Sequence, residues 1–116
     1  MRGHVDDLTP AMFHILMALV DRERHGYGIM QEIALRTDGA VRLGPGTLYR
    51  SIKALLESGM IEESDVRPDP VLDDERRRYY RITALGMAAA QDEARRLERL
   101  VELARDKRLL GTEGIA

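Results

Sequence analysis

The last third of the chain carries an apolar stripe that a single small domain cannot cover. Apolar side chains recur there at alternating intervals of three and four residues, at Met87, Ala90, Ala94, Leu97, Val101 and Ala104. This spacing is typical of the seam along which one helix packs on another, and Leu100 and Leu103 widen it. A helix that runs from a Thr83 cap to about Leu110 would be roughly 40 Å long, so its stripe would extend beyond its own domain. The pattern therefore predicts a partner helix and, with it, a homodimer.

The length and composition limit the chain to one small domain and exclude several chemistries. The 116 residues are enough for one domain over residues 1–82, the long helix over 83–110 and a flexible tail over 111–116. There is no cysteine, which excludes disulfides, thiolate metal sites and cysteine nucleophiles. The three histidines lack the spacing of metal ligands. We therefore expect no metal site and no cofactor.

The segment after Thr9 is predicted to be a helix that is buried on more than one side. Thr9 can cap it, and Pro10 suits its first position. Apolar side chains then cover nearly its whole circumference, and such a helix is normally buried all round. One side can face its own core and the other a second subunit. The residues expected at the dimer interface are Phe13, Leu16, Met17 and Val20 here, and Ala90, Ala94, Leu97, Leu100, Val101 and Ala104 in the long helix.

Glycines and polar residues divide the rest of the domain into two more helices and a hairpin. His25 is expected to be a turn or capping residue. Three helices followed by a hairpin is the order of a winged helix-turn-helix, so the predicted fold is mostly α with a small β-hairpin and a long C-terminal helix. The expected elements are a polar turn over 21–25, helices from Gly26 to about Gly39 and over 47–58, strands over 60–64 and 76–82, and a polar hairpin tip over 65–75.

The third helix has one face suited to the major groove of DNA. Its inward face is apolar, with Leu48, Ile52, Leu55 and Leu56. A guanidinium that can bind guanine or phosphate, and small residues that allow close approach, are what a groove-reading helix needs. The N–H groups of its first turn can also bind a phosphate. The outward residues are Thr47, Arg50, Lys53 and Ala54, and the residues of the first turn are Gly46 and Thr47.

The second strand of the hairpin is strongly basic. It begins with Arg76-Arg77-Arg78, and strand alternation places Arg77, Tyr79 and Arg81 on one face with Tyr80 and Ile82 on the other. We expect Tyr80 in the core, the arginines against DNA backbone or a minor groove, and the Tyr79 phenol near a phosphate. The alternative is a solvated hairpin in which these arginines pair with acids of the tip, at Asp73, Asp74 and Glu75.

The distribution of charge favours DNA more than the net charge does. The chain has 18 Lys and Arg against 20 Asp and Glu, a formal charge of −2, which by itself argues against a simple polycationic binder. Residues 42–53 and 76–81, however, contain basic residues and no acids. Local segregation of this kind matters more for DNA binding than the net value.

Four segments in this order resemble the PadR family of bacterial transcriptional regulators. They are His25-Gly26-Tyr27-Gly28-Ile29, Gly46-Thr47-Leu48-Tyr49-Arg50-Ser51-Ile52, Leu56-Glu57-Ser58-Gly59-Met60-Ile61 and Arg78-Tyr79-Tyr80-Arg81-Ile82-Thr83-Ala84-Leu85-Gly86. The resemblance covers about residues 8–110. It implies a winged-helix DNA-binding domain, a C-terminal dimerisation helix, and repression at a palindromic operator that a small molecule often relieves. The single C-terminal helix is similar to that of the short subfamily.

The resemblance also implies roles for individual residues. Tyr49 matches a tyrosine of the recognition helix near the DNA backbone, and Tyr27 matches the glycine-tyrosine pair that opens the second helix. Arg78 and Tyr80 match the basic and aromatic residues of the wing. The surface of Phe13, Met17 and the last helix is the candidate effector site. Members that bind planar drugs use a tryptophan in the last helix, and this chain has no tryptophan, so a site of that kind is not expected.

Two other classes of function compete with a DNA-binding repressor. A winged helix can also be a protein-interaction module, which here would bind a partner through the acidic hairpin tip. An enzyme has no support, because no nucleophile–base pair or metal cluster is recognisable. The longest apolar stretch, Ala11 to Val20, is far shorter than the roughly 20 residues that span a bilayer. We therefore expect a cytoplasmic protein without a membrane segment.

Overall fold

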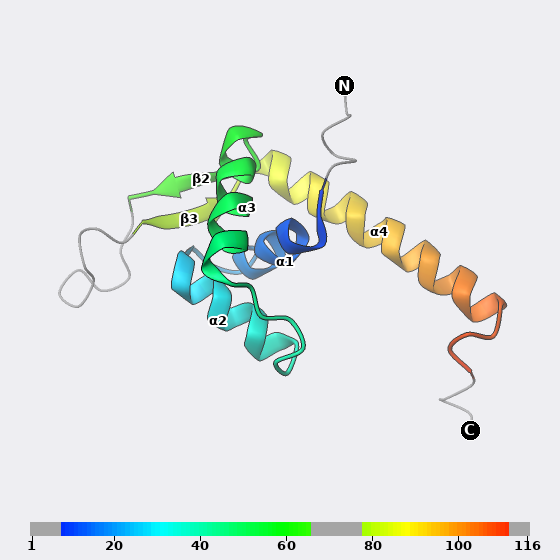
Figure 1. The fold of residues 1–116 in the computed structure, drawn as a ribbon. Coiled ribbons are helices and arrows are strands. Elements are labelled where there is room, and N and C mark those ends of the chain that lie inside the picture. The colour runs from blue at the N-terminus through cyan, green and yellow to red at the C-terminus, as the bar shows by residue number, and fades with distance from the viewer. Residues whose placement is uncertain (1–7, 66–77, 112–116) are drawn as a thin grey trace.

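The computed structural model describes residues 8–65 and 78–111, and Figure 1 shows their arrangement. A cluster of three short helices lies against a small sheet, and a fourth helix extends away from the cluster. This confirms a mostly helical chain with a small antiparallel sheet and a long C-terminal helix. The elements are α1 (Pro10–Leu19), β1 (Arg24–His25), α2 (Gly26–Arg36), α3 (Pro45–Glu57), β2 (Ile61–Ser64), β3 (Tyr79–Ile82) and α4 (Ala84–Asp106).

Local sequence signals account for the starts and stops of the helices. The Thr9 hydroxyl accepts a hydrogen bond from the Met12 N–H at 3.1 Å, and Pro10 is the first helical residue. His25 caps α2, as expected, because its Nδ1 accepts from the Gly28 N–H at 3.1 Å. The turns after α2 and α3 use left-handed backbone at Gly39 (φ 81°) and Gly59 (φ 77°), which glycine adopts readily.

The sheet has three strands in the order β1-β3-β2, not the two of a simple hairpin. β2 and β3 pair antiparallel, with Glu62 opposite Arg81 and Ser64 opposite Tyr79. On the other edge of β3, Arg24 pairs with Tyr80. The prediction of a polar turn over residues 21–25 is therefore wrong for its last two residues. A two-residue strand has no periodicity that a sequence pattern reveals.

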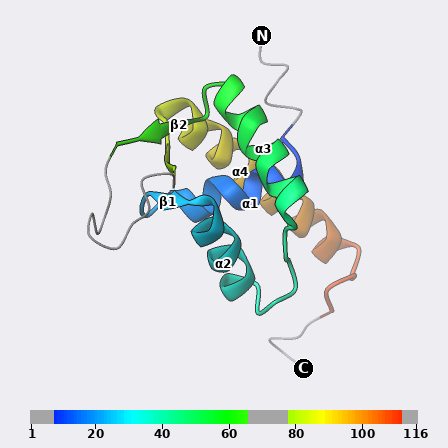
Figure 2. The same ribbon diagram turned by 60° about the vertical axis from the view of Figure 1, so that its left-hand side comes forward.

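The core lies between α1, α2, α3 and the inner face of the sheet. α1 crosses the middle of the domain and contacts α2, α3 and α4 (Figure 2). Leu16 has no exposed surface, so its prediction as a dimer-interface residue is wrong and it belongs to the core of its own subunit. The largest fully buried side chains are Ile15, Leu16, Ile29, Leu48, Leu55, Met60 and Ile61.

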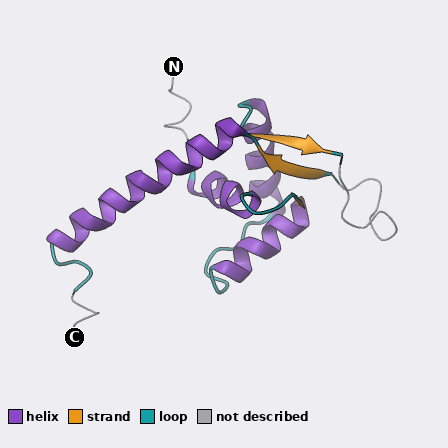
Figure 3. Cartoon of the chain, turned by 180° about the vertical axis from the view of Figure 1, so that it is seen from behind, coloured by secondary structure: helices purple, strands orange, loops and turns teal. Residues whose placement is uncertain are grey.

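α4 begins inside the domain and then leaves it, as the view from behind shows (Figure 3). Its buried residues, Gly86, Ala89 and Ala90, all lie in its first two turns. Ala90 is 7% exposed, so it packs on its own subunit, and its prediction as an interface residue is wrong. The helix ends at Asp106, a turn earlier than expected, because Arg108 adopts left-handed backbone (φ 64°).

Gly86 fixes how closely α4 approaches the connection between α3 and β2. A Cβ at this position would overlap the Met60 carbonyl oxygen and come within 2.9 Å of Ile82 Cγ1. The Gly86→Ala variant should lose about 1–3 kcal/mol of unfolding free energy, the usual range for overpacking, in urea denaturation. Gly44→Ala is the matched control, since a Cβ at Gly44 meets nothing within 4 Å. Equal stability of the two variants would contradict the tight contact.

Candidate nucleic-acid interface

The outward face of α3 is polar and basic, and its inward face is apolar and buried in the core. Leu48, Ile52 and Leu55 are buried in the core. Arg50 and Lys53 are exposed on the opposite side, and Tyr49 is 51% exposed beside them. The amphipathic pattern predicted for this helix is confirmed, with Thr47 and Ala54 half-buried at its edges. The helix thus presents its cations to solvent on a rigid element.

The N-terminal turn of α3 has a positive electrostatic potential that no acidic or capping side chain of that turn neutralises. Its N-cap is Gly44, which has no side chain to satisfy the first N–H groups, and there is no acid in its first turn. Arg50 folds back over that turn, with a guanidinium nitrogen 3.4 Å from the Thr47 hydroxyl. The helix dipole has its positive end here, so it repels the positively charged Arg50 guanidinium. The arrangement therefore favours an anion above Gly46 and Thr47.

Tyr49 joins this site to the start of α2. Its ring lies so close to Gly26 that a Cβ there would overlap the Tyr49 hydroxyl. Tyr27 follows in the first turn of α2 and is 56% exposed. The Tyr49 phenol therefore lies beside the first residue of α2, and Tyr27 lines a hollow together with Arg42 and Leu43, which precede α3.

Arg42 is a further exposed cation that the sequence analysis did not select. It lies in the connection before α3, with its guanidinium over Gly39. It borders a hollow of about 330 Å³ lined by Tyr27, Met30, Gln31, Ala34, Arg42 and Leu43. Within residues 8–65 and 78–111, no carboxylate pairs with Arg42, Arg50 or Lys53. The signal that identifies Arg42 was present in the sequence, as the first residue of the acid-free run over 42–53.

The described arginines of the hairpin are paired with glutamates. Arg78 is 3.1 Å from Glu63, and Arg81 is 2.7 Å from Glu62, which raises the pKa of Arg81 through that hydrogen bond. These partners lie on the neighbouring strand, whereas the sequence pointed to acids of the tip. Arg76, Arg77 and the acids at 73–75 lie outside the described residues.

The two tyrosines of β3 are both buried, which contradicts one prediction. Tyr80 is in the core, as expected, and burial followed by the nearby negative charge of Glu63 raises its pKa. Tyr79 is only 6% exposed, so its prediction as an outward residue that offers a phenol to phosphate is wrong. The reason is β1, the strand that pairs with β3 through His25 and Tyr79. The His25 ring packs edge-on against Tyr79 with centroids 5.1 Å apart.

Exposed apolar side chains gather on α1 and the projecting part of α4. At the end of α1 they are Met17 and Val20, the residue that directly follows the helix, whereas Phe13 packs partly on its own core. On α4 they are Leu100, Val101 and Leu103, each about half-exposed. Ala94 is also exposed, and Leu97 and Ala104 are half-buried.

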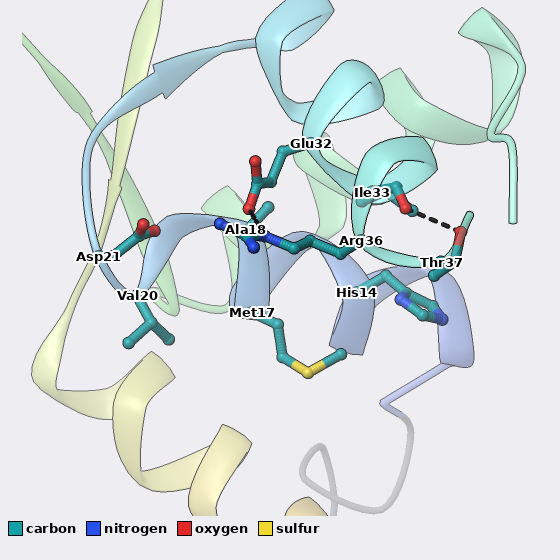
Figure 4. A pocket seen from close by; sticks show the side chains of 9 residues that line it. All are labelled: His14, Met17, Ala18, Val20, Asp21, Glu32, Ile33, Arg36 and Thr37. Carbon is teal, nitrogen blue, oxygen red and sulfur yellow. Dashed lines mark hydrogen bonds and ion pairs between the residues drawn. The ribbon is translucent and has the colours of Figure 1, made fainter. Parts of the chain in front are cut away.

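A hollow of about 450 Å³ lies along α1 and is lined by residues of α1, α2 and the segments that follow each of them (Figure 4). His14, Met17 and Val20 line the hollow from α1 and the residue after it. Glu32 and Arg36 of α2 also line it, and they form an ion pair at 2.8 Å. Phe13 is not among its lining residues. Of the two residues predicted for an effector site, only Met17 lines this hollow, and Phe13 lies one turn earlier on the same helix.

The described residues offer few other kinds of site. In the parts of the chain that the structure covers, no three His, Cys, Asp or Glu side chains are grouped to hold a metal ion. None of the described helices is long and apolar enough to cross a membrane.

Three helices, the last of them with an exposed basic face, and a small sheet behind them define a winged helix-turn-helix. The chain belongs to the PadR-like family of transcriptional regulators, whose sequence pattern matches residues 15–92. Its function is therefore transcriptional regulation, and the family is not one of enzymes.

Known relatives and structures agree with this assignment. The transcriptional regulator Rv3488 of Mycobacterium tuberculosis is 38% identical over 93 residues, which are 80% of this chain and 78% of the relative. A transcriptional regulator from Clostridium thermocellum has a similar structure, with a TM-score of 0.69 and 25% identity over 82% of this chain and 89% of that one. A PadR family regulator from Clostridium difficile has the same fold at 19% identity, with a TM-score of 0.70 over 89% of this chain and all of that one (100%).

Proposed function

We propose that the chain is a homodimeric repressor that binds an inverted-repeat operator in double-stranded DNA. The observation that carries this proposal is the exposed face of α3, where an uncapped helix start, Arg50 and Lys53 face solvent with no acid in the first turn. In water this concentration of positive potential is unfavourable, and the phosphates of DNA would neutralise it.

Each α3 would enter a major groove, as the second helix of a helix-turn-helix does. Arg50 and Lys53 would lie in the groove with Thr47, and the Gly46 and Thr47 N–H groups would bind a phosphate. Tyr27 and Tyr49 would contact the backbone beside them. The wing arginines, Arg76, Arg77 and Arg78, would reach the adjacent backbone or minor groove.

The dimer would form through α4 and α1. The projecting part of α4, over residues 91–106, has no buried residue, and an isolated helix of this length is marginal in water. A second copy that covers Ala94, Leu97, Leu100, Val101 and Ala104 with Met17 and Val20 would stabilise it. The chain would then divide into a DNA-binding domain over 1–82, which also holds the first turns of α4, the dimerisation helix and a short tail.

A small-molecule effector would act through the same region. A ligand beside Met17 would lie next to the proposed two-fold axis, and a small shift there changes the spacing of the two α3 helices. The protein would act where its operator is, in the cytoplasm.

Selection of bound sequences from random duplex DNA tests the proposal. Purified protein should enrich an inverted repeat whose half-sites are about one helical turn apart, or a multiple of it. Absence of any enriched sequence would favour a winged-helix module that binds a protein instead. An enriched single half-site would contradict the dimeric arrangement.

A separate prediction concerns Arg42, which lies at the edge of the basic surface around α3. If its unpaired guanidinium neutralises a phosphate, Arg42→Ala should weaken binding to all duplexes alike. Because each protomer of the proposed dimer loses one contact, the slope of log affinity against log salt should become shallower by about two. The control is Arg36→Ala, which removes an exposed arginine that is already paired with Glu32. Fluorescence anisotropy over a range of salt measures both, and an unchanged slope for Arg42→Ala would remove it from the interface.

A further inference from the structure

Glu63 lies where the wing meets α3. Strand alternation puts Glu63 on the same face of β2 as Ile61, which is buried in the core. Glu63 is also directly opposite Tyr80 in the sheet. This face of the sheet is the one that packs toward α3, so the carboxylate of Glu63 is at the α3 side of the wing.

The neighbours of Tyr80 support this placement. Burial is the main reason that the pKa of Tyr80 is raised, but Glu63 and Tyr49 raise it further and Arg78 opposes them. Tyr49 belongs to the outward surface of α3. Tyr80 is therefore close both to the Glu63–Arg78 ion pair and to Tyr49, one of the residues that we propose to contact DNA.

Glu62, the preceding residue, can be compared with Glu63 because it also pairs with an arginine of β3 or its flank. It points to the opposite face of β2, where it bonds Arg81 at 2.7 Å. Arg81 there also faces Glu23, at 3.7 Å, and Ser64, at 3.5 Å. The two neighbouring glutamates thus make similar ion pairs, one on the α3 side of the sheet and one away from it.

We propose that Glu63 is an affinity-determining residue, which withholds the Arg78 guanidinium from DNA until a correctly placed phosphate displaces the carboxylate. The inference rests on the proposed DNA-binding function. Both side chains of the pair are exposed, at 48% for Glu63 and 66% for Arg78, so the pair is weak and exchange with a phosphate is feasible. Phosphates that approach at random meet the negative charge of Glu63 as well as the cation. The pair therefore opposes binding to arbitrary sequences more than binding to the operator.

The test compares Glu63→Gln with Glu62→Gln in titrations of a 30-base-pair duplex of mixed sequence. Glu63→Gln releases the Arg78 guanidinium for a phosphate, which should tighten binding about fivefold at 0.1 M salt. The salt slope should also steepen by about two, because the Arg78 of each protomer now neutralises a phosphate. Glu62→Gln should change affinity less than about twofold, since its carboxylate is on the far face.

A second pair of variants tests whether Glu63 acts through Arg78. In an Arg78→Gln background, Glu63→Gln should tighten binding by no more than about twofold, because the guanidinium that it would release is gone. A gain that persists in full in this background would overturn the inference, and so would equal behaviour of the Glu62 and Glu63 variants. If the wild-type protein bound no duplex, the proposed function would fail and the inference with it, whereas wild-type binding with no gain in Glu63→Gln overturns the inference alone.

Discussion

A chain with Leu100→Asp and Val101→Asp should sediment as a monomer at micromolar concentration and bind an inverted-repeat operator at least about 100-fold more weakly than the wild type. Both residues are about half-exposed on the part of α4 that projects from the domain, so the substitutions leave the core intact. They place two carboxylates in the proposed interface, where burial without partners is unfavourable. A monomer engages one half-site at a time and loses the effective concentration that a linked second site provides.

The control for this variant is Arg95→Gln with Arg99→Gln. These residues are exposed on the same helix, away from the apolar stripe, and the double substitution lowers the net charge by the same two units. This control should remain dimeric and keep most of its affinity. A dimeric Asp variant, or a monomeric variant that binds the operator with unchanged affinity, would contradict the role assigned to α4.

Arg50→Ala should weaken operator binding about 10- to 100-fold, the range for loss of one guanidinium at a groove-reading position. The side chain is exposed, and among the described residues its one side-chain hydrogen bond is the 3.4 Å contact with Thr47, so its removal should not lower stability. It would remove the cation that lies above the uncapped first turn of α3. Electrophoretic mobility shift with the selected operator measures the loss, and circular dichroism confirms that the fold is intact.

Arg50→Lys separates the two ways in which this side chain can act. Lysine keeps the charge and loses the planar fork that binds guanine in two places. A phosphate contact predicts near wild-type affinity for Arg50→Lys, and a base contact predicts a loss close to that of Arg50→Ala. Wild-type affinity in both variants would remove Arg50 from the interface.

The helices could be predicted from the sequence because their signals are local. Thr9, His25 and Thr83 cap three of the helices with their own side chains, and Gly39 and Gly59 form the turns that follow α2 and α3. The face of α3 that carries Arg50 followed from periodicity alone. The caps, the turns and the exposed face of α3 all depend on residues that are a few positions apart in the sequence, so the sequence pattern is enough to predict them.

The errors arose where contacts depend on residues distant in sequence. Tyr79 was placed outward because alternation along β3 does not show that β1, more than 50 residues earlier, covers it. Leu16 was placed at the interface because a helix that is apolar all round does not reveal which side meets its own core. The partners of Arg78 and Arg81 depend on the register in which β2 pairs with β3, and the sequence pattern does not reveal that register.

The net charge of −2 is compatible with a DNA-binding surface because charges are separated in space. In the described residues, the cations of α3 and the preceding connection are unpaired, whereas the acids of β2 are engaged with arginines of the wing. We therefore expect the chain to have little general attraction for DNA and its affinity to depend on correct docking of α3. The proposed action of Glu63 strengthens that dependence.

The most direct test of this account is the salt dependence of wild-type binding to the selected operator. Two protomers that each present Arg42, Arg50 and Lys53 to phosphate would neutralise about six charges, and the wing arginines would add to them, so log affinity should fall linearly with log salt with a slope of about −5 or steeper. A slope near zero would contradict the central claim that the basic surface around α3 binds the backbone of DNA.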